Sequence, residues 1–125
     1  MKYQISFTRK GPYVLVEVFE PMTVKLAAEI AMKATETASE HNSNLFLYDV
    51  RKAPNVDPCA ENYFFAHTDM PAMQLDRSAR VALLASPDDE SHKFIATAIR
   101  NAGYNVRLFF EEEQATEWLT RLVSR

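Results

Sequence analysis

Residues 45–50 read Leu-Phe-Leu-Tyr-Asp-Val, and residues 81–85 read Val-Ala-Leu-Leu-Ala. Both runs are short and almost continuously apolar, which is typical of strands that are covered on both faces, as in parallel sheets. Segments with apolar residues spaced by three and four, the pattern of amphipathic helices, lie between and after them. Strands that alternate with helices imply parallel strands joined by right-handed crossovers. The two runs therefore predict an α/β fold.

A hairpin is expected ahead of this unit. Apolar and polar residues alternate over residues 3–7, which is the period of a half-buried strand, and residues 13–19 are rich in β-branched and aromatic side chains. Only a short break that contains Gly11 and Pro12 separates the two segments. Two strands so closely connected predict an antiparallel pair.

Two helices are expected in the first two thirds of the chain. Thr23 is a suitable N-cap for the first, which should end near the polar residues 41–44. The second is expected from about Pro58 to Asp69. Pro71 must then break or restart it, which leaves the conformation of the residues up to position 77 open.

Two more helices are expected after residue 85. Ser86 and Pro87 predict the start of the third helix, because serine caps helices and proline suits their first turn, and Gly103 predicts its end. The apolar stripe of the last helix consists of Ala115, Trp118, Leu119 and Leu122. The resulting order, β-β-α-β-α-β-α-β-α, predicts a single domain over residues 1–125, with a mostly parallel sheet and an antiparallel first strand.

Composition argues against a nucleic-acid partner, a disulfide and a membrane span. The formal net charge is -3 and the basic residues are scattered, so the sequence offers no clustered basic face for a nucleic acid. Cys59 is the only cysteine, which excludes an internal disulfide and any Cys-x-x-Cys motif. No signal-peptide core and no membrane-spanning apolar run is present. We therefore expect a cytoplasmic protein without a membrane span.

No motif for a cofactor or a catalytic centre is present. Gly11 and Gly103 are the only glycines, so the chain has no glycine-rich loop for phosphates, and the histidines lack metal-ligand spacing. An enzyme would need titratable groups to converge, and the candidates are Asp49, Asp57, Glu61 and His67. The simpler interpretation is that His67 lies on an exposed helix face, and we expect His92 on the solvent side of its helix as well. No cofactor, metal or catalytic residue is assigned.

Polar side chains follow the two buried strands. Asp49 and Arg51 come after the first of them and Ser86 after the second. Ligands of open α/β sheets bind outside the carboxyl ends of the strands, where Arg51 could hold an anionic group through two hydrogen bonds. The alternative is that Asp49 and Arg51 form a local salt bridge or cap.

The segment around Pro71 carries more apolar residues than one helix face can use: Tyr63, Phe64, Phe65, Met70, Met73 and Leu75. Such an excess lines an apolar pocket, forms a docking surface or belongs to the core. A pocket would lie between this segment and the first helix, lined by the region of Phe64 and Met73.

Several stretches are similar to a known family. They are the initial hairpin, residues 45–49 with the long loop that follows, residues 80–84, and residues 106–109 followed by the Ala-x-x-Trp-Leu pattern of residues 115–119. On these the chain resembles the anti-sigma-factor antagonist-like (STAS) domains, in particular their SpoIIAA-like or STAS/SEC14-type bacterial branch. The resemblance covers nearly the whole chain and implies a sheet with helices packed around it.

The better-known STAS proteins bind a partner kinase and are switched by phosphorylation of a serine. The matching stretch here, Asp57-Pro58-Cys59-Ala60-Glu61, contains no serine or threonine. Cys59 stands about where the serine would be, either as a sensor thiol or as a small apolar residue.

We therefore expect a non-enzymatic regulatory or protein-interaction module of STAS-like type, without the phospho-switch serine, that binds a protein partner or self-associates as a homodimer. The alternatives are a carrier or sensor of a small apolar or amphipathic ligand, as the SEC14-type comparison suggests, and an uncharacterised enzyme. The tentative binding residues are Asp49, Arg51, Asp57, Cys59, Phe64, Met73 and Ser86.

Overall fold

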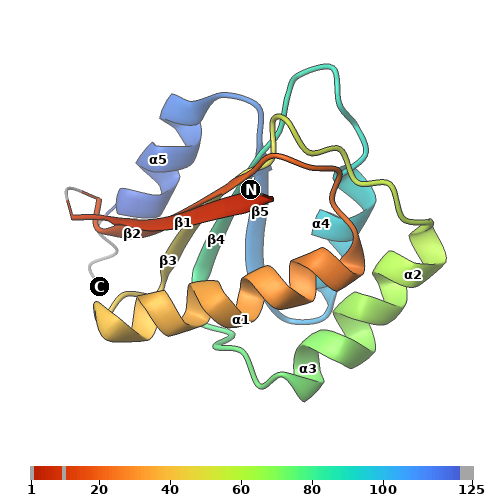
Figure 1. The fold of residues 1–125 in the computed structure, drawn as a ribbon, viewed down its shortest axis with the longest axis horizontal. Coiled ribbons are helices and arrows are strands. Elements are labelled where there is room, and N and C mark those ends of the chain that lie inside the picture. Colours follow the sequence, from red (N-terminus) through yellow and green to blue (C-terminus); the bar gives the residue numbers. More distant parts are fainter. Residues whose placement is uncertain (1, 10, 122–125) are drawn as a thin grey trace.

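A five-stranded mixed sheet forms the centre of the molecule (Figure 1). The computed structural model describes residues 2–9 and 11–121. The strands are β1 (Tyr3–Thr8), β2 (Tyr13–Val18), β3 (Leu45–Asp49), β4 (Arg80–Leu84) and β5 (Asn105–Phe109). The helices are α1 (Val24–Glu40), α2 (Cys59–Phe64), the π-helical turn η1 (Phe65–Asp69), α3 (Met70–Ala72), α4 (Lys93–Asn101) and α5 (Glu112–Thr120).

The strands lie side by side in chain order, from β1 to β5. β1 runs antiparallel to β2, and every other neighbouring pair is parallel. The predictions of an α/β fold, an initial hairpin and a mostly parallel sheet are confirmed. Within the described residues, no helix is both long and apolar enough to cross a membrane.

Helices cover both faces of the sheet, but unequally. α1, α4 and the helices between them lie on one face, and α5 lies on the other (Figure 1). Because side chains alternate along a strand, each strand contributes to both layers. Val14, Val16 and Val18 of β2 join the core beneath α1. On the opposite face the core consists of Leu47, Ala82, Leu84, Ala115 and Leu119.

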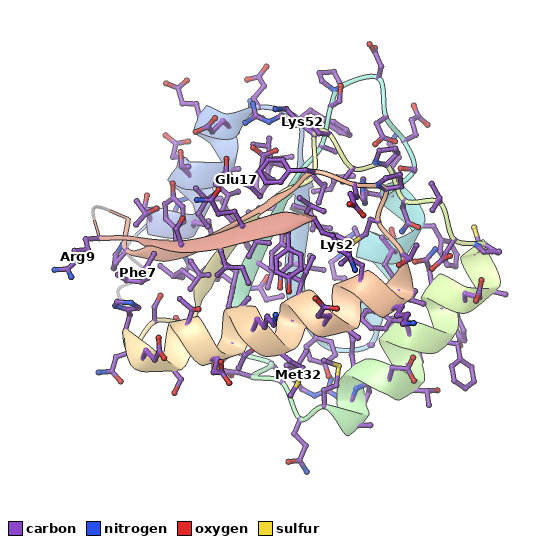
Figure 2. The ribbon with its side chains drawn as sticks, in the orientation of Figure 1. Lys2, Phe7, Arg9, Glu17, Met32 and Lys52 are labelled. Atoms are coloured by element: carbon purple, nitrogen blue, oxygen red, sulfur yellow. The ribbon has the colours of Figure 1, made fainter. Side chains whose placement is uncertain are left out.

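α1 begins as the sequence predicts. The Thr23 hydroxyl accepts a hydrogen bond from the backbone N–H of Leu26, 3.1 Å away, which satisfies one free donor of the first turn. Leu26, Ile30, Ala34 and Ala38 form its buried stripe. Its outer side carries exposed residues such as Met32, which points away from the sheet (Figure 2) and is 58% exposed.

Pro71 lies in the first turn of a new helical element, α3, in agreement with the prediction that it breaks or restarts the helix there. Helical backbone continues from Cys59 to Ala72, and the register changes in the π-helical turn, where the N–H of Met70 donates to the carbonyl of Phe65. A proline ring clashes with the carbonyl four residues earlier in a regular α-helix. The wider turn ahead of Pro71 accommodates the ring.

The third predicted helix begins later than expected. Ser86 and Pro87 were predicted to start it, but α4 starts at Lys93. The N–H of Asp89 donates to the carbonyl of Ser86 at 2.9 Å, and the Asp89 carboxylate accepts from the N–H of Ser91 at 2.8 Å. Serine, proline and aspartate favour such turns as strongly as they favour a helix start, and here the turn forms.

α5 buries Ala115 and Leu119, as its stripe predicts, whereas Trp118 is only partly buried. The guanidinium groups of Arg80 and Arg107 lie 5.9 and 5.8 Å from the centre of the Trp118 ring. Leu122, the last member of the predicted stripe, lies outside the described residues.

α4 ends at a glycine, as predicted. The N–H of Gly103 donates to the carbonyl of Arg100 at 3.0 Å, and the N–H of Tyr104 donates to the carbonyl of Ile99 at 3.3 Å. These two bonds form a Schellman motif, in which the residue after the helix takes a left-handed conformation. Gly103 has φ 103°, and the motif places Tyr104 against Ile99.

Replacing Gly103 by alanine should therefore lower the free energy of unfolding by about 1–3 kcal/mol, because L side chains rarely adopt this φ. Urea denaturation measures the loss. The added Cβ would also lie 2.5 Å from the Arg77 guanidinium, so the substitution is repeated in an Arg77→Ala background. The same loss in both backgrounds is expected; recovery in the second would assign the effect to the clash instead.

Candidate functional site

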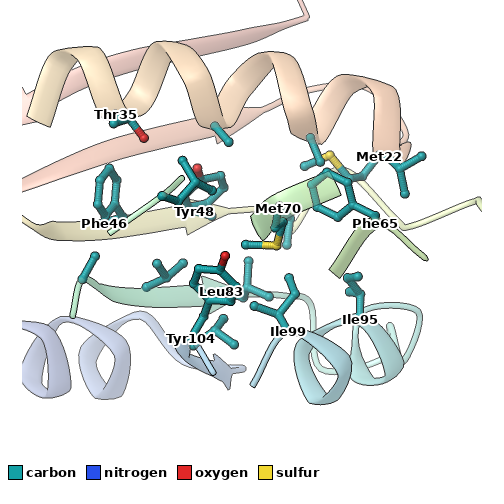
Figure 3. Close-up of a pocket in the computed structure, with 18 of the residues that line it drawn as sticks. Met22, Thr35, Phe46, Tyr48, Phe65, Met70, Leu83, Ile95, Ile99 and Tyr104 are labelled. Atoms are coloured by element: carbon teal, nitrogen blue, oxygen red, sulfur yellow. The ribbon is translucent and has the colours of Figure 1, made fainter. Parts of the chain in front are cut away.

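A cavity of about 320 Å³ lies between the sheet and the helices on the α1 side (Figure 3). Its lining is almost entirely apolar. Its floor is formed by alternate residues of the strands: Phe46, Tyr48, Val81, Leu83 and Val106. Its roof is formed by Ala27, Ala31 and Thr35 of α1, Phe65 and Met70 of the helical segment 59–72, and Ile99 of α4.

The cavity arises from where the helices rest. α1 packs mainly on β1 and β2, α4 packs on β5, and α2 packs on α4 rather than on the sheet. In the described chain, β3 and β4 therefore have no helix packed directly on this face. Ala27 and Ala31 border the gap from α1, but their methyl groups are too small to fill it. Protein interiors rarely contain voids much larger than a water molecule, so this space is the candidate site.

The opening of the cavity is polar. Four of its lining residues are exposed: Thr35 and Ser39 of α1, Asn44 before β3, and Asp76 before β4. The loops that carry Asn44 and Asp76 both lead into the N-terminal ends of parallel strands. The cavity therefore opens at the N-terminal end of the parallel strands. The site was expected at the opposite end, beyond their carboxyl ends.

The other end of the cavity is closed by a buried asparagine. Asn62 of α2 is 5% exposed, and its amide nitrogen lies 3.1 Å from the carbonyl oxygens of both Asp57 and Pro58. Its amide oxygen accepts from the side chain of Asn55 at 3.0 Å. The asparagine side chain is thus fully engaged within the protein.

His92 lines the same end and is 2% exposed. Its Nε2 lies 2.9 Å from the carbonyl oxygen of Ala53. Because a carbonyl can only accept, Nε2 carries the proton. Burial lowers the pKa of His92, and this outweighs the opposite effects of the Ala53 carbonyl and of the Asp89 carboxylate. The ring is therefore neutral near neutral pH, and the expectation that His92 faces solvent is wrong.

Tyr48 lies in the middle of the floor, on the same face of β3 as Phe46 and next to Val50, which follows the strand. Burial raises the pKa of its phenol. No hydrogen bond joins its hydroxyl to another described residue, but the hydroxyl is not sealed off, since none of the buried side-chain polar atoms of the described residues lacks a partner. Protein surrounds the ring, but part of the ring surface borders the cavity, so the residue is only partly buried. Figure 3 shows the hydroxyls of Tyr48, Thr35 and Tyr104 directed into the space.

The predicted rim residues engage each other. Arg51 donates from Nε and Nη2 to the two carboxylate oxygens of Asp49, at 2.9 and 2.7 Å, which is the local salt bridge named as the alternative. Its Nη2 also lies 3.4 Å from Glu112 of α5. Burial disfavours the charged form of Asp49, but the hydrogen bonds from Arg51 outweigh it and lower the pKa of the carboxyl. The backbone carbonyl of Ser86 accepts the hydrogen bond from the N–H of Asp89 that forms the turn described above.

Asp57 and Cys59 also lie apart from the cavity lining. The Asp57 carboxylate accepts a hydrogen bond from the N–H of Val24 at 2.6 Å, so it caps α1 from a distant loop. Cys59 is exposed and is the first residue of α2.

The apolar segment around Pro71 lines the cavity, but not through Phe64 and Met73, which were expected to line it. Phe64 is 60% exposed, and Met73 is partly buried outside the lining. Phe65, Met70 and Leu75 line the cavity instead. None of the seven tentative site residues therefore lies in the cavity wall.

Three polar residues that were not singled out from the sequence line the site: Tyr48 on its floor, Thr35 at its opening, and Tyr104. One signal was present for Tyr48, because it is the only residue with a hydroxyl in the buried run 45–50. The small residues of α1 were interpreted as close packing on the sheet, whereas Ala27 and Ala31 border empty space.

The chain matches no model of a known protein family and no curated protein. Among residues 2–9 and 11–121, no three histidine, cysteine, aspartate or glutamate side chains are grouped so that they could hold a metal ion. The site is therefore defined by its own geometry, as an internal apolar cavity with a polar opening.

The lowered pKa of His92 makes stability depend on pH. The unfolded chain, with a histidine pKa of about 6.5, binds the proton more tightly than the folded protein, so stability should fall as the pH drops below that value. His92→Gln, which keeps a donor for Ala53, should flatten the curve between about pH 7.5 and 5. Urea denaturation at each pH measures this.

His67→Gln is the matched control, because His67 is exposed, and it should retain the slope of the wild type. Identical slopes for the wild type and His92→Gln would contradict the lowered pKa.

Proposed function

We propose that this protein is a carrier or sensor that binds a small apolar or amphipathic ligand in the cavity between β3, β4 and the helices. The observation that carries the proposal is the size and character of that cavity, about 320 Å³ with an almost entirely apolar lining. Small-molecule sites are typically concave, mostly apolar and about 300–1,000 Å³ in volume. The cavity fits this description at its lower end.

The free energy of an empty cavity supports a ligand. Cavities left by core substitutions cost about 24 cal/mol per Å³, so an empty space of this size would cost at most about 8 kcal/mol. The whole stability of a domain is about 5–15 kcal/mol. Water gains little there, since it needs several polar partners and the floor offers mainly hydrocarbon. An apolar ligand would recover the lost contacts.

We also propose that the domain is STAS-like, of the SpoIIAA-like or SEC14-type branch. Its support is the resemblance in the sequence, together with the initial hairpin and the successive strand–helix units of the fold. Within that branch, a cavity under the helices favours the ligand-binding alternative over the interaction module.

The ligand proposal predicts that freshly purified protein carries extra mass in native mass spectrometry, which disappears on denaturation. Ala31→Phe places a ring in the cavity from α1 and should abolish the extra mass. Because it fills a void, it should also raise the free energy of unfolding of the empty protein by about 0.5–2 kcal/mol.

Met32→Phe is the control, since residue 32 is the next position on α1 and is 58% exposed. It should retain the bound mass. If the wild type carries no extra mass and takes up no apolar compound after purification, the carrier proposal is wrong.

A protein-interaction role is the second candidate, and exposed aromatic side chains favour it. Tyr63 and Phe64 are adjacent on α2 and are 55% and 60% exposed, and Val56 before the helix is 56% exposed. Large apolar side chains that gather at a surface mark docking sites.

If this surface mediates self-association, sedimentation velocity should find a dimer whose dissociation constant rises at least tenfold in Phe64→Ser. Folding should be unaffected, because most of the Phe64 side chain already lies in solvent. A monomer at all concentrations would reject self-association and leave a different protein as the partner.

A further inference from the structure

Three features of the cavity define the chemistry of its occupant: its volume, its lack of charge and the position of its hydroxyl groups. Each restricts a different property of the ligand, and the restrictions are independent of one another. The inference rests on the proposed function, because it concerns the same cavity.

The volume limits how much of a ligand the cavity can enclose, so a ligand that lies wholly inside must be compact. An engineered protein cavity of about 150 Å³ accepts benzene, so a cavity of about 320 Å³ holds roughly a dozen non-hydrogen atoms. Two fused aromatic rings or a medium-length aliphatic chain fill it. A lipid with two acyl chains is several times too large.

The absence of positive charge excludes an anionic group inside. None of the described residues that line the cavity is a lysine or an arginine, and His92 is neutral. Asp76 at the opening is the one acidic group of the lining, and it would repel an anion. Arg77, which follows it, is engaged elsewhere: its guanidinium lies 4.4 Å from the centre of the Tyr104 ring and donates to the carbonyl of Ala102.

The apolar interior disfavours a cation as well. A charged group that is moved from water into such surroundings must be paired with an opposite charge, and only the exposed opening carries one. The ligand is therefore neutral.

Tyr48 supplies the polar contact. The amide of Asn62 is engaged by protein partners, and Nε2 of His92 is held by the Ala53 carbonyl. The Tyr48 hydroxyl, in contrast, faces the cavity from the floor, where a ligand can reach it (Figure 3). Once a ligand fills the cavity and excludes water, a hydroxyl that is left without a hydrogen bond is unfavourable, so a ligand that bonds to it is preferred over a pure hydrocarbon. Figure 3 shows the hydroxyls of Thr35 and Tyr104 around the same space.

We infer that the cavity binds a neutral, compact, mostly apolar molecule of roughly a dozen non-hydrogen atoms whose one hydroxyl or carbonyl group hydrogen-bonds to Tyr48. The contact is made near the middle of the cavity, so the polar group lies inside the protein and the hydrocarbon fills the space on both sides of it.

Naphthalene, naphthol and naphthoate test this, since all three have about the right size and differ only in the polar group. Titrations at neutral pH, by calorimetry or ligand-observed nuclear magnetic resonance, use protein freed of any bound compound. Naphthol should bind about three- to tenfold more tightly than naphthalene, which is the effect of one neutral hydrogen bond. Naphthoate should bind at least about tenfold more weakly than naphthol.

Tyr48→Phe removes only the hydroxyl and should lower the affinity for naphthol to that for naphthalene, while naphthalene binding stays unchanged. Tyr63→Phe, at a site that is 55% exposed, should change neither. The unchanged naphthalene affinity also shows that the variant is folded.

The outcomes separate the two proposals. If naphthalene binds as tightly as naphthol, if naphthoate binds best, or if Tyr48→Phe has no effect, the inference about the ligand is overturned while the cavity remains a binding site. If none of the three compounds binds, both proposals are wrong.

Discussion

One loop, residues 53–57, holds together the three helices that surround the cavity. Asp57 accepts the hydrogen bond of Val24 at the start of α1, and Asn55 bonds to Asn62 of α2. The backbone N–H of Asn55 donates to the hydroxyl of Ser91 at 2.8 Å, and the carbonyl of Ala53 accepts from His92, directly before α4. These contacts fix α1, α2 and α4 at one end of the sheet. The rest of the architecture on this face depends on them.

The cavity follows from that attachment. Because α2 is held by the loop and by α4, it does not pack onto the strands. Asn62 of α2 closes the inner end of the space above β3 and β4, and Phe65 and Met70, which follow α2, contribute to its roof. The hydrogen bonds of the loop hold α2 in this position, although apolar surfaces would otherwise tend to pack against each other. The same loop buries two polar side chains, Asn62 and His92, and gives each a hydrogen-bond partner, so the inner end of the cavity is closed without unsatisfied groups.

The site is therefore unlike the usual ligand site of an open α/β sheet, which lies outside the carboxyl ends of the strands. Here Asp49 and Arg51 at that rim are engaged by each other and by Glu112, and they join β3 to α5. The opening lies at the other end, where α1 ends and the chain enters β3 and β4. A ligand would lie on the face of the sheet, under the helices, and the rim would serve the stability of the α5 layer.

The sequence by itself determined the fold class and the hairpin of this protein, since these follow from apolar periodicity and short connections, which are local. The order of the strands in the sheet came only from the tertiary structure. The sequence also determined the ends of α1 and α4 at Thr23 and Gly103, where a side-chain cap and a left-handed glycine are required. It could not decide between a turn and a helix at Ser86, because the same residues suit both and their environment selects one.

Only the tertiary structure decided where the apolar excess around Pro71 goes. Phe64 and Phe65 are equivalent in the sequence, yet one faces solvent and the other the cavity, because the orientation of the helix depends on hydrogen bonds from the distant loop. Tyr48 likewise belongs to an ordinary buried strand in the sequence, and only the position of α1 leaves its hydroxyl facing a cavity. A cavity is a space that no residue fills, so its position depends on how all the surrounding elements pack and is not encoded in any single segment.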